Sequence, residues 1–144
     1  MTLHILKLCV GVDTVEELAK WERSFLKAQK TRGKKKPELM HVTRQTPKRA
    51  DDILNGGSLY WVIKGQIAVR QKILELRPVT RGGTPHCGIV YDKTLVPVQR
   101  RVQRAFQGWR YLNPQDAPPD ASGGKGGEGL PESLKAELVT LGLL

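Results

Sequence analysis

The sequence has few cysteines and no long apolar run. Its two cysteines, Cys9 and Cys87, each lie in a strand-like apolar segment, with no CxxC or Cys/His ligand spacing around them. We therefore expect neither a disulfide nor a metal site, and we predict that both thiols are small buried hydrophobes. The apolar stretch at residues 1–12 is too short to span a membrane and lacks a basic n-region and a cleavage site. These absences indicate a cytoplasmic protein.

Catalytic motifs are also lacking. The three histidines, His4, His41 and His86, form no HExxH motif, and the sequence contains no GxSxG, P-loop or GxGxxG. Asp51 and Asp52 are adjacent on a predicted helix, so their side chains diverge and make a poor acid–base pair. The glycine-rich GGKGGEG segment has no flanking strand and helix, which a phosphate loop requires. The sequence therefore favours a protein without catalysis, and we expect no cofactor and no metal.

Positive charge, in contrast, is abundant. The 144 residues include 24 Lys and Arg against 14 Asp and Glu, which gives a formal net charge of +10. Such an excess favours polyanionic partners, nucleic acid before an anionic membrane, and the alternative is a basic surface that binds nothing. No lipidation signal or long basic amphipathic helix is present, so we expect no membrane binding. The charge does not predict an oligomeric state.

Short apolar runs separated by turn signals predict a mixed α+β domain. A capping box at Thr14 and Glu17 starts a helix that runs to about residue 30, with Trp21 in the core. A second helix is expected over 47–55, ending at a left-handed glycine cap at residues 56–57. The first strand is expected to be central and buried. Strands are predicted at 3–10, 39–43, 58–64, 67–76, 86–91 and 95–102.

The domain organisation follows from a change in composition after residue 112. Residues 1–112 are predicted to form one core domain with a mixed, partly closed sheet and two or three helices. Residues 113–130 are rich in Pro and Gly and low in apolar content, which predicts a flexible linker. Residues 131–144 are predicted to form a C-terminal helix that docks on the core through Leu134, Leu138 and Leu141.

The predicted hairpin at residues 58–76 carries cations and rings on both arms. Alternation places Trp61 on the core face, with Tyr60 and Lys64 meeting Arg70 and Lys72 on the opposite, wetter face. The basic loop at residues 30–38 is predicted to be solvated and to add only non-specific affinity. The hairpin is therefore a candidate surface for a negatively charged partner.

Residues 100–114, RRVQRAFQGWRYLNP, combine arginines with aromatic residues and contain no acid. Guanidinium groups pair with phosphates and aromatic rings stack on unpaired bases, a combination that suits RNA more than DNA. In the alternative reading, Phe106 and Trp109 belong to the core and the arginines are merely exposed. The predicted contacts are to phosphate for Lys48, Arg49, Lys64, Arg70, Arg101, Arg104 and Arg110, and to bases by stacking for Tyr60, Trp109 and Tyr111.

Three blocks of the sequence resemble a bacterial family known as domain of unknown function 1489. They are LHILKLCVGVDTVEEL, HVTRQTPKRADDILNGGSLYWVIKGQIAVRQKILELRPV and FQGWRYLNPQDAPPD, and the resemblance extends to the final LGLL. The resemblance implies no specific activity. The basic loop and the glycine-rich linker look longer than is usual for the family, which makes both weak places for a shared activity.

The plan of a short helix leading into the GGSLYWVIKG strand is similar to that of the PUA-like domains, including the ASCH and EVE groups. This similarity implies a compact pseudo-barrel that binds RNA or modified bases, although a shared fold does not determine function. Gly65 is followed by Gln66-Ile67-Ala68-Val69-Arg70, which departs from the ASCH pattern Gly-x-Lys-x-x-Glu-x-Arg and argues against an ASCH-like role. We therefore predict a nucleic-acid-binding module, with two alternatives: an enzyme or small-ligand binder with a pocket for a modified nucleotide or other anion, or an adaptor on a ribonucleoprotein or acidic protein.

Overall fold

The computed structural model describes residues 1–121, which form a seven-stranded mixed sheet with two helices. The strand order is β2-β5-β4-β3-β1-β7, with β6 paired to β4 beside this path, and the sheet is not closed. The predicted α+β class and partly closed sheet are confirmed, whereas residues 122–130 and the predicted helix at 131–144 lie outside the described residues. The elements are β1 (His4–Leu8), α1 (Val15–Thr31), β2 (Leu39–Thr43), α2 (Ala50–Leu54), β3 (Ser58–Ile63), β4 (Gln66–Arg81), β5 (Thr84–Tyr91), β6 (Val96–Val102), β7 (Trp109–Leu112) and the 3₁₀ turn η1 (Pro114–Asp116).

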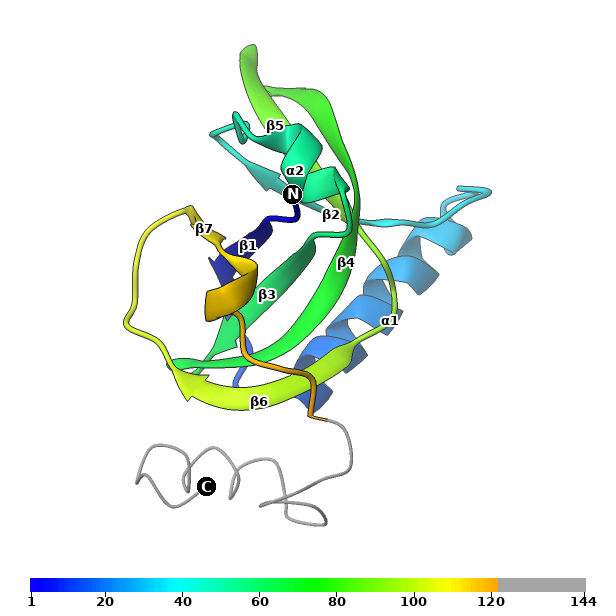
Figure 1. Cartoon of the computed structure of the whole chain (residues 1–144). Helices are drawn as coiled ribbons and strands as arrows, with labels where there is room; N and C mark the ends of the chain where they lie inside the picture. The colour runs from blue at the N-terminus through cyan, green and yellow to red at the C-terminus, as the bar shows by residue number, and fades with distance from the viewer. Residues whose placement is uncertain (122–144) are drawn as a thin grey trace.

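Strand β4 is sixteen residues long, so it pairs with different strands along its length and connects them into one sheet. Its first part pairs with β3 on one edge and with β6 on the other, and its second part pairs with β5. Register shifts near Val69 and Ile73 mark irregularities of the kind that bend a strand. Gly82 and Gly83, both with positive φ, form the two-residue turn into β5. Figure 1 shows β4 curving through the centre of the molecule, with α1 running alongside it.

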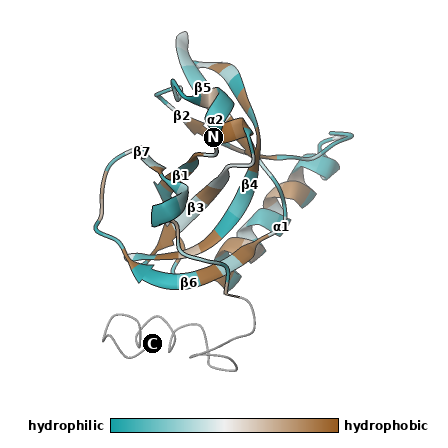
Figure 2. Cartoon of the chain, viewed as in Figure 1, coloured by the Kyte–Doolittle hydropathy of each residue, from teal (hydrophilic) through white to brown (hydrophobic). Residues whose placement is uncertain are grey.

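The two faces of β3 are both buried. Leu59, Trp61 and Ile63 belong to one apolar cluster, whereas Tyr60 and Val62 belong to a second. The second cluster is completed by side chains of β1, β6, β7 and the loop between β6 and β7, so the expectation of a wet face behind Trp61 is wrong. Brown, apolar segments accordingly occur along the central strands in Figure 2. The predicted placement of Trp61 in the core is confirmed.

Helix α1 buries a carboxylate rather than a tryptophan. The predicted cap at Thr14 is confirmed, since its Oγ1 accepts a hydrogen bond from the Glu17 amide at 3.1 Å. Trp21 is 49% exposed and stacks on Phe25, whereas Glu22 is only 3% exposed. The prediction that Trp21 is a core residue is therefore wrong, because the helix turns Glu22 toward the sheet.

Helix α2 is shorter than predicted and begins at Ala50, after an Arg49 that provides no side-chain cap. The predicted glycine cap is confirmed, because Gly56 has a φ of +88°. The next residue, Gly57, packs so closely that an added Cβ would lie 2.2 Å from the carbonyl oxygen of Leu3. This contact holds α2 against the N-terminal segment. Among residues 1–121, no helix is long and apolar enough to cross a membrane.

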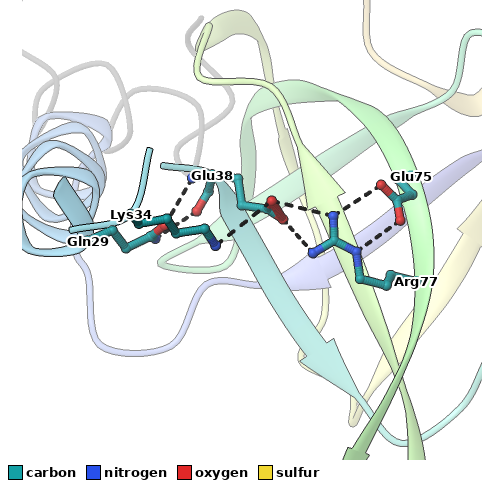
Figure 3. A network of polar contacts seen from close by, with 5 residues as sticks. All are labelled: Gln29, Lys34, Glu38, Glu75 and Arg77. Carbon is teal, nitrogen blue, oxygen red and sulfur yellow. Dashed lines mark hydrogen bonds and ion pairs between the residues drawn. The ribbon is translucent and has the colours of Figure 1, made fainter. Parts of the chain in front are cut away.

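A polar network anchors the basic loop at its C-terminal end (Figure 3). Gln29 on α1 makes two hydrogen bonds to the backbone of Glu38, and the Glu38 carboxylate contacts Lys34 and Arg77. Arg77 on β4 also binds both carboxylate oxygens of Glu75. These two carboxylates raise the pKa of Arg77. Arg77 thus ties the end of the loop to the sheet.

Residues 113–121, which we call the strap, lie against the sheet rather than free of it. The amide of Gln99 donates to the carbonyl of Pro119 at 2.9 Å, and the amide of Ala121 donates to the carbonyl of Pro97 at 2.9 Å. In Figure 1 the strap passes from η1 across β6. The described structure therefore continues past the predicted core boundary at residue 112 and into the predicted linker.

Candidate nucleic-acid interface and pocket

Four of the predicted phosphate contacts lie on or beside the segment that joins β6 to β7. They are Lys64 in the β3–β4 turn, Arg101 on β6, Arg104 in the loop at 103–108 and Arg110 on β7, and we call them the basic face. The amide of Gln103 donates to the carbonyl of Gly65 at 2.8 Å, which places the β3–β4 turn beside this loop. Figure 1 shows the yellow loop swinging out between β6 and β7 at the side of the molecule.

The cations of the basic face have no carboxylate partner within residues 1–121. The ion pairs of this part of the chain engage Lys34, Arg49, Arg70 and Arg77 instead. Arg101 donates to the backbone carbonyl of Asp116, and the Arg110 guanidinium lies 4.8 Å from the centroid of the Phe106 ring. Both contacts orient a guanidinium and leave its charge uncompensated. Phe106 is buried, as the alternative reading of this segment expected.

Two predicted stacking residues lie together on β7. The Trp109 and Tyr111 rings meet edge to face, with centroids 4.9 Å apart. The Trp109 indole N–H donates to the carbonyl of Gln45 at 3.0 Å, and the Tyr111 hydroxyl accepts from the amide of Arg49 at 3.2 Å. Tyr111 is 39% exposed, whereas Trp109 is partly buried against the first apolar cluster. We call this pair the aromatic edge.

Lys48 and Arg49 precede α2 and lie next to the aromatic edge through the Arg49–Tyr111 hydrogen bond. Arg49 also pairs with Asp52 at 3.0 Å, so part of its charge is compensated. Because α2 has only five residues and starts after Arg49, the predicted arrangement of two cations in the first turn of a helix is wrong. Both side chains remain exposed.

Tyr60 and Arg70 lie apart from the basic face, in a pocket with a volume of about 470 Å³. They face each other across β3 and β4, as predicted, but Tyr60 is only 4% exposed. Arg70 pairs with Asp120 of the strap through both carboxylate oxygens, at 2.7 and 2.8 Å. His4 and Ser58 complete the polar lining.

Sequence reasoning missed three of these pocket residues. No motif includes His4, Ser58 is only the first residue of a predicted strand, and Asp120 lies in the predicted linker. One signal was available, because Asp120 is the acid of the proline-rich stretch APPDA at residues 117–121. The partner of that acid, Arg70, lies 50 residues away, and no local pattern connects the two.

The fold and these surfaces define an α+β protein with a bent mixed sheet, a basic face and a small polar pocket. Within the described residues, no three His, Cys, Asp or Glu side chains are placed to hold a metal ion. Residues 5–144 match the family described as "Protein of unknown function (DUF1489)", and the chain belongs to this family. Comparison with the curated proteins and with the solved structures found no match. The similarity to PUA-like domains therefore stays a prediction.

Proposed function

We propose that the protein is a nucleic-acid-binding module without catalysis, which binds single-stranded RNA in preference to DNA. The observation that supports it best is the basic face. Its four cations have no carboxylate partner within residues 1–121, and two of them are held in place by a carbonyl or an aromatic ring. Cations held in this way bind phosphates at a low cost in conformational entropy.

The aromatic edge supplies the second half of the proposed interface. Alternate residues of β7 point to opposite faces, so Arg110 lies on one side of the strand and Tyr111 on the other. Strand β7 is at the end of the strand order and pairs only with β1 among the described strands. A nucleic-acid strand that crosses this free edge would place phosphates at Arg110 and stack a base on Tyr111. Each stacked base contributes ~1–3 kcal/mol.

Of the other four predicted contacts, two have supporting roles in this proposal and two lie outside the proposed surface. Lys48 and Arg49 lie beside Tyr111 and would meet the phosphate next to the stacked base. Tyr60 is too buried to offer a ring face, and the Arg70 fork is already filled by Asp120. The continuous surface is therefore limited to the basic face and the aromatic edge.

The test compares two double charge reversals by fluorescence anisotropy with a labelled single-stranded RNA of about twelve nucleotides. Arg101→Glu/Arg104→Glu changes the basic face, and Lys35→Glu/Lys36→Glu makes the same change of net charge in the basic loop. We expect the first pair to weaken binding by at least about tenfold, because two phosphate contacts become repulsive, and the second pair to weaken it much less. Equal losses of RNA affinity in both variants would contradict the proposed interface, because they would show that only the net charge of the protein determines binding.

A further inference from the structure

The pocket between the strap and the sheet is lined by side chains from four parts of the chain. His4 comes from β1, Ser58 and Tyr60 from β3, Arg70 from β4, and Asp120 from the strap. Prolines of the strap form an apolar wall opposite the strands. Its volume of about 470 Å³ lies within the range of small-molecule sites. None of the residues that line the pocket belongs to the basic face or the aromatic edge.

Arg70 is the central charge of the pocket. Its Nη1 donates to the Ser58 hydroxyl at 3.1 Å, and its Nε and Nη2 donate to the two carboxylate oxygens of Asp120 at 2.7 and 2.8 Å. The planar fork of an arginine matches a carboxylate or a phosphate equally well. Asp120 is therefore an anion supplied by the chain itself. Its side chain is 44% exposed, so an external anion can reach the pair and compete with the carboxylate for the arginine fork.

The other polar side chains of the pocket, those of His4, Ser58 and Tyr60, each have one proton to donate. The Ser58 amide donates to Nδ1 of His4 at 2.9 Å, so the neutral imidazole carries its proton on Nε2. Burial, together with the charge of Arg70, lowers the pKa of His4 and keeps the ring neutral. The Tyr60 ring meets the His4 ring edge to face at 5.0 Å, and its hydroxyl makes no hydrogen bond within residues 1–121. If the carboxylate of Asp120 is not counted, the polar side chains that line the pocket offer more hydrogen-bond donors than acceptors.

We propose that this pocket binds a phosphate monoester and that Asp120 occupies the phosphate position in the unliganded protein. The Arg70 fork alone would satisfy a flat carboxylate, whereas the further donors from Ser58, Tyr60 and His4 suit the three oxygens of a tetrahedral phosphate. The apolar wall of the strap would contact the organic part of the ligand. Release of Asp120 would accompany binding.

Titration calorimetry with inorganic phosphate and with adenosine 5′-monophosphate tests this site on the full chain. Asp120→Asn removes the internal competitor, and we expect about fivefold tighter binding of both probes. Arg70→Gln should weaken binding by at least about tenfold, because the fork is lost. Arg77→Gln is the matched control, since it removes the same charge from β4 at an arginine that also contacts carboxylates. A thermal melt of each variant confirms folding, and Asp120→Asn keeps the test decisive if Arg70→Gln does not fold.

The phosphate monoester could belong to the end of a nucleic acid or to a free metabolite. Two oligoribonucleotides of one sequence, with and without a 5′-phosphate, distinguish these sources. Tighter binding of the phosphorylated form that depends on Arg70 assigns the site to a nucleic-acid end, and mononucleotide binding alone assigns it to a free metabolite. Arg104→Glu changes the basic face without removing the Arg101 hydrogen bond to the strap, so it should leave phosphate binding intact, and this site and the proposed nucleic-acid face can fail separately. The proposal is overturned if Asp120→Asn does not improve phosphate binding. It is also overturned if neither the wild type nor the Asp120→Asn variant binds phosphate or the mononucleotide saturably.

Discussion

Replacement of the buried Glu22 by Gln should remove a large part of the pH dependence of stability. Glu22 lies on the buried side of α1, where its Oε1 accepts from the Gln71 amide at 2.9 Å and its Oε2 has no hydrogen-bond partner within residues 1–121. Gln71 in turn accepts from the Trp61 indole N–H at 2.8 Å. Burial is the main cause that raises the pKa of Glu22 to about 7, against the favourable hydrogen bond from Gln71. The carboxyl group is therefore protonated in the folded protein under mildly acidic conditions.

The size and sign of the effect follow from this pKa. A rise from an ordinary value of 4.5 to about 7 corresponds to about 3 kcal/mol. Between these two pH values the folded protein holds a proton that the unfolded chain has released. The stability contributed by protonated Glu22 is therefore complete below pH 4.5 and is lost as the pH rises to 7. The side chain of the Glu22→Gln variant cannot ionise, so the variant does not lose stability in this way as the pH rises.

Urea unfolding followed by tryptophan fluorescence at pH 4.5, 6 and 8 measures this difference. We expect Glu22→Gln to gain about 3 kcal/mol relative to the wild type between pH 4.5 and pH 8. Replacing the carboxyl group by an amide also changes the free energy of unfolding by an amount that is the same at every pH. The quantity to compare is therefore how the difference in this free energy between variant and wild type changes with pH. Asp51→Asn makes the same change in net charge at an exposed position. A difference between Glu22→Gln and the wild type that stays flat across this range would refute the reasoning.

Three further substitutions test a close backbone contact and a buried hydrogen bond. Gly57→Ala should destabilise the protein by about 3 kcal/mol in the same urea assay, because its Cβ would lie 2.2 Å from the Leu3 carbonyl oxygen, and unchanged stability would contradict that contact. Trp61→Phe should cost ~1–3 kcal/mol by leaving the buried Gln71 oxygen without a donor. The Trp109 indole donates to an exposed carbonyl, so Trp109→Phe should lower the free energy of unfolding by less than Trp61→Phe does. A larger loss in Trp109→Phe would show that the hydrogen bond to Gln71 adds little.

The parts of the fold that sequence predicted are those specified locally. The start of α1 follows from Thr14 and Glu17, three residues apart, and the end of α2 follows from Gly56. Periodicity could not choose between Trp21 and Glu22, because both fit a helical face within one position. The choice is made by Gln71, 49 residues away on β4, which supplies the donor for a buried carboxyl group.

Other features depend on contacts that no local pattern contains. Strand β7 has only four residues and pairs with β1 across about a hundred residues of chain, so it was missed. For the same reason alternation predicts a wet Tyr60 side of β3, although side chains of β1, β6, β7 and the β6–β7 loop bury it. The sequence predicts the arginines of the basic face because they are clustered at residues 101–110, whereas it does not predict the pocket, because Arg70 and Asp120 meet only after folding.

A salt titration of RNA binding tests the central claim most directly. The wild type and Arg101→Glu/Arg104→Glu are titrated with KCl against single-stranded RNA, duplex RNA and single-stranded DNA of one sequence. The account predicts tightest binding to single-stranded RNA, persisting at physiological salt, and a slope of log K against log salt that is less steep by about 1.5 in the variant. Binding that disappears at physiological salt, ignores the type of nucleic acid and keeps the same slope in the variant would contradict it.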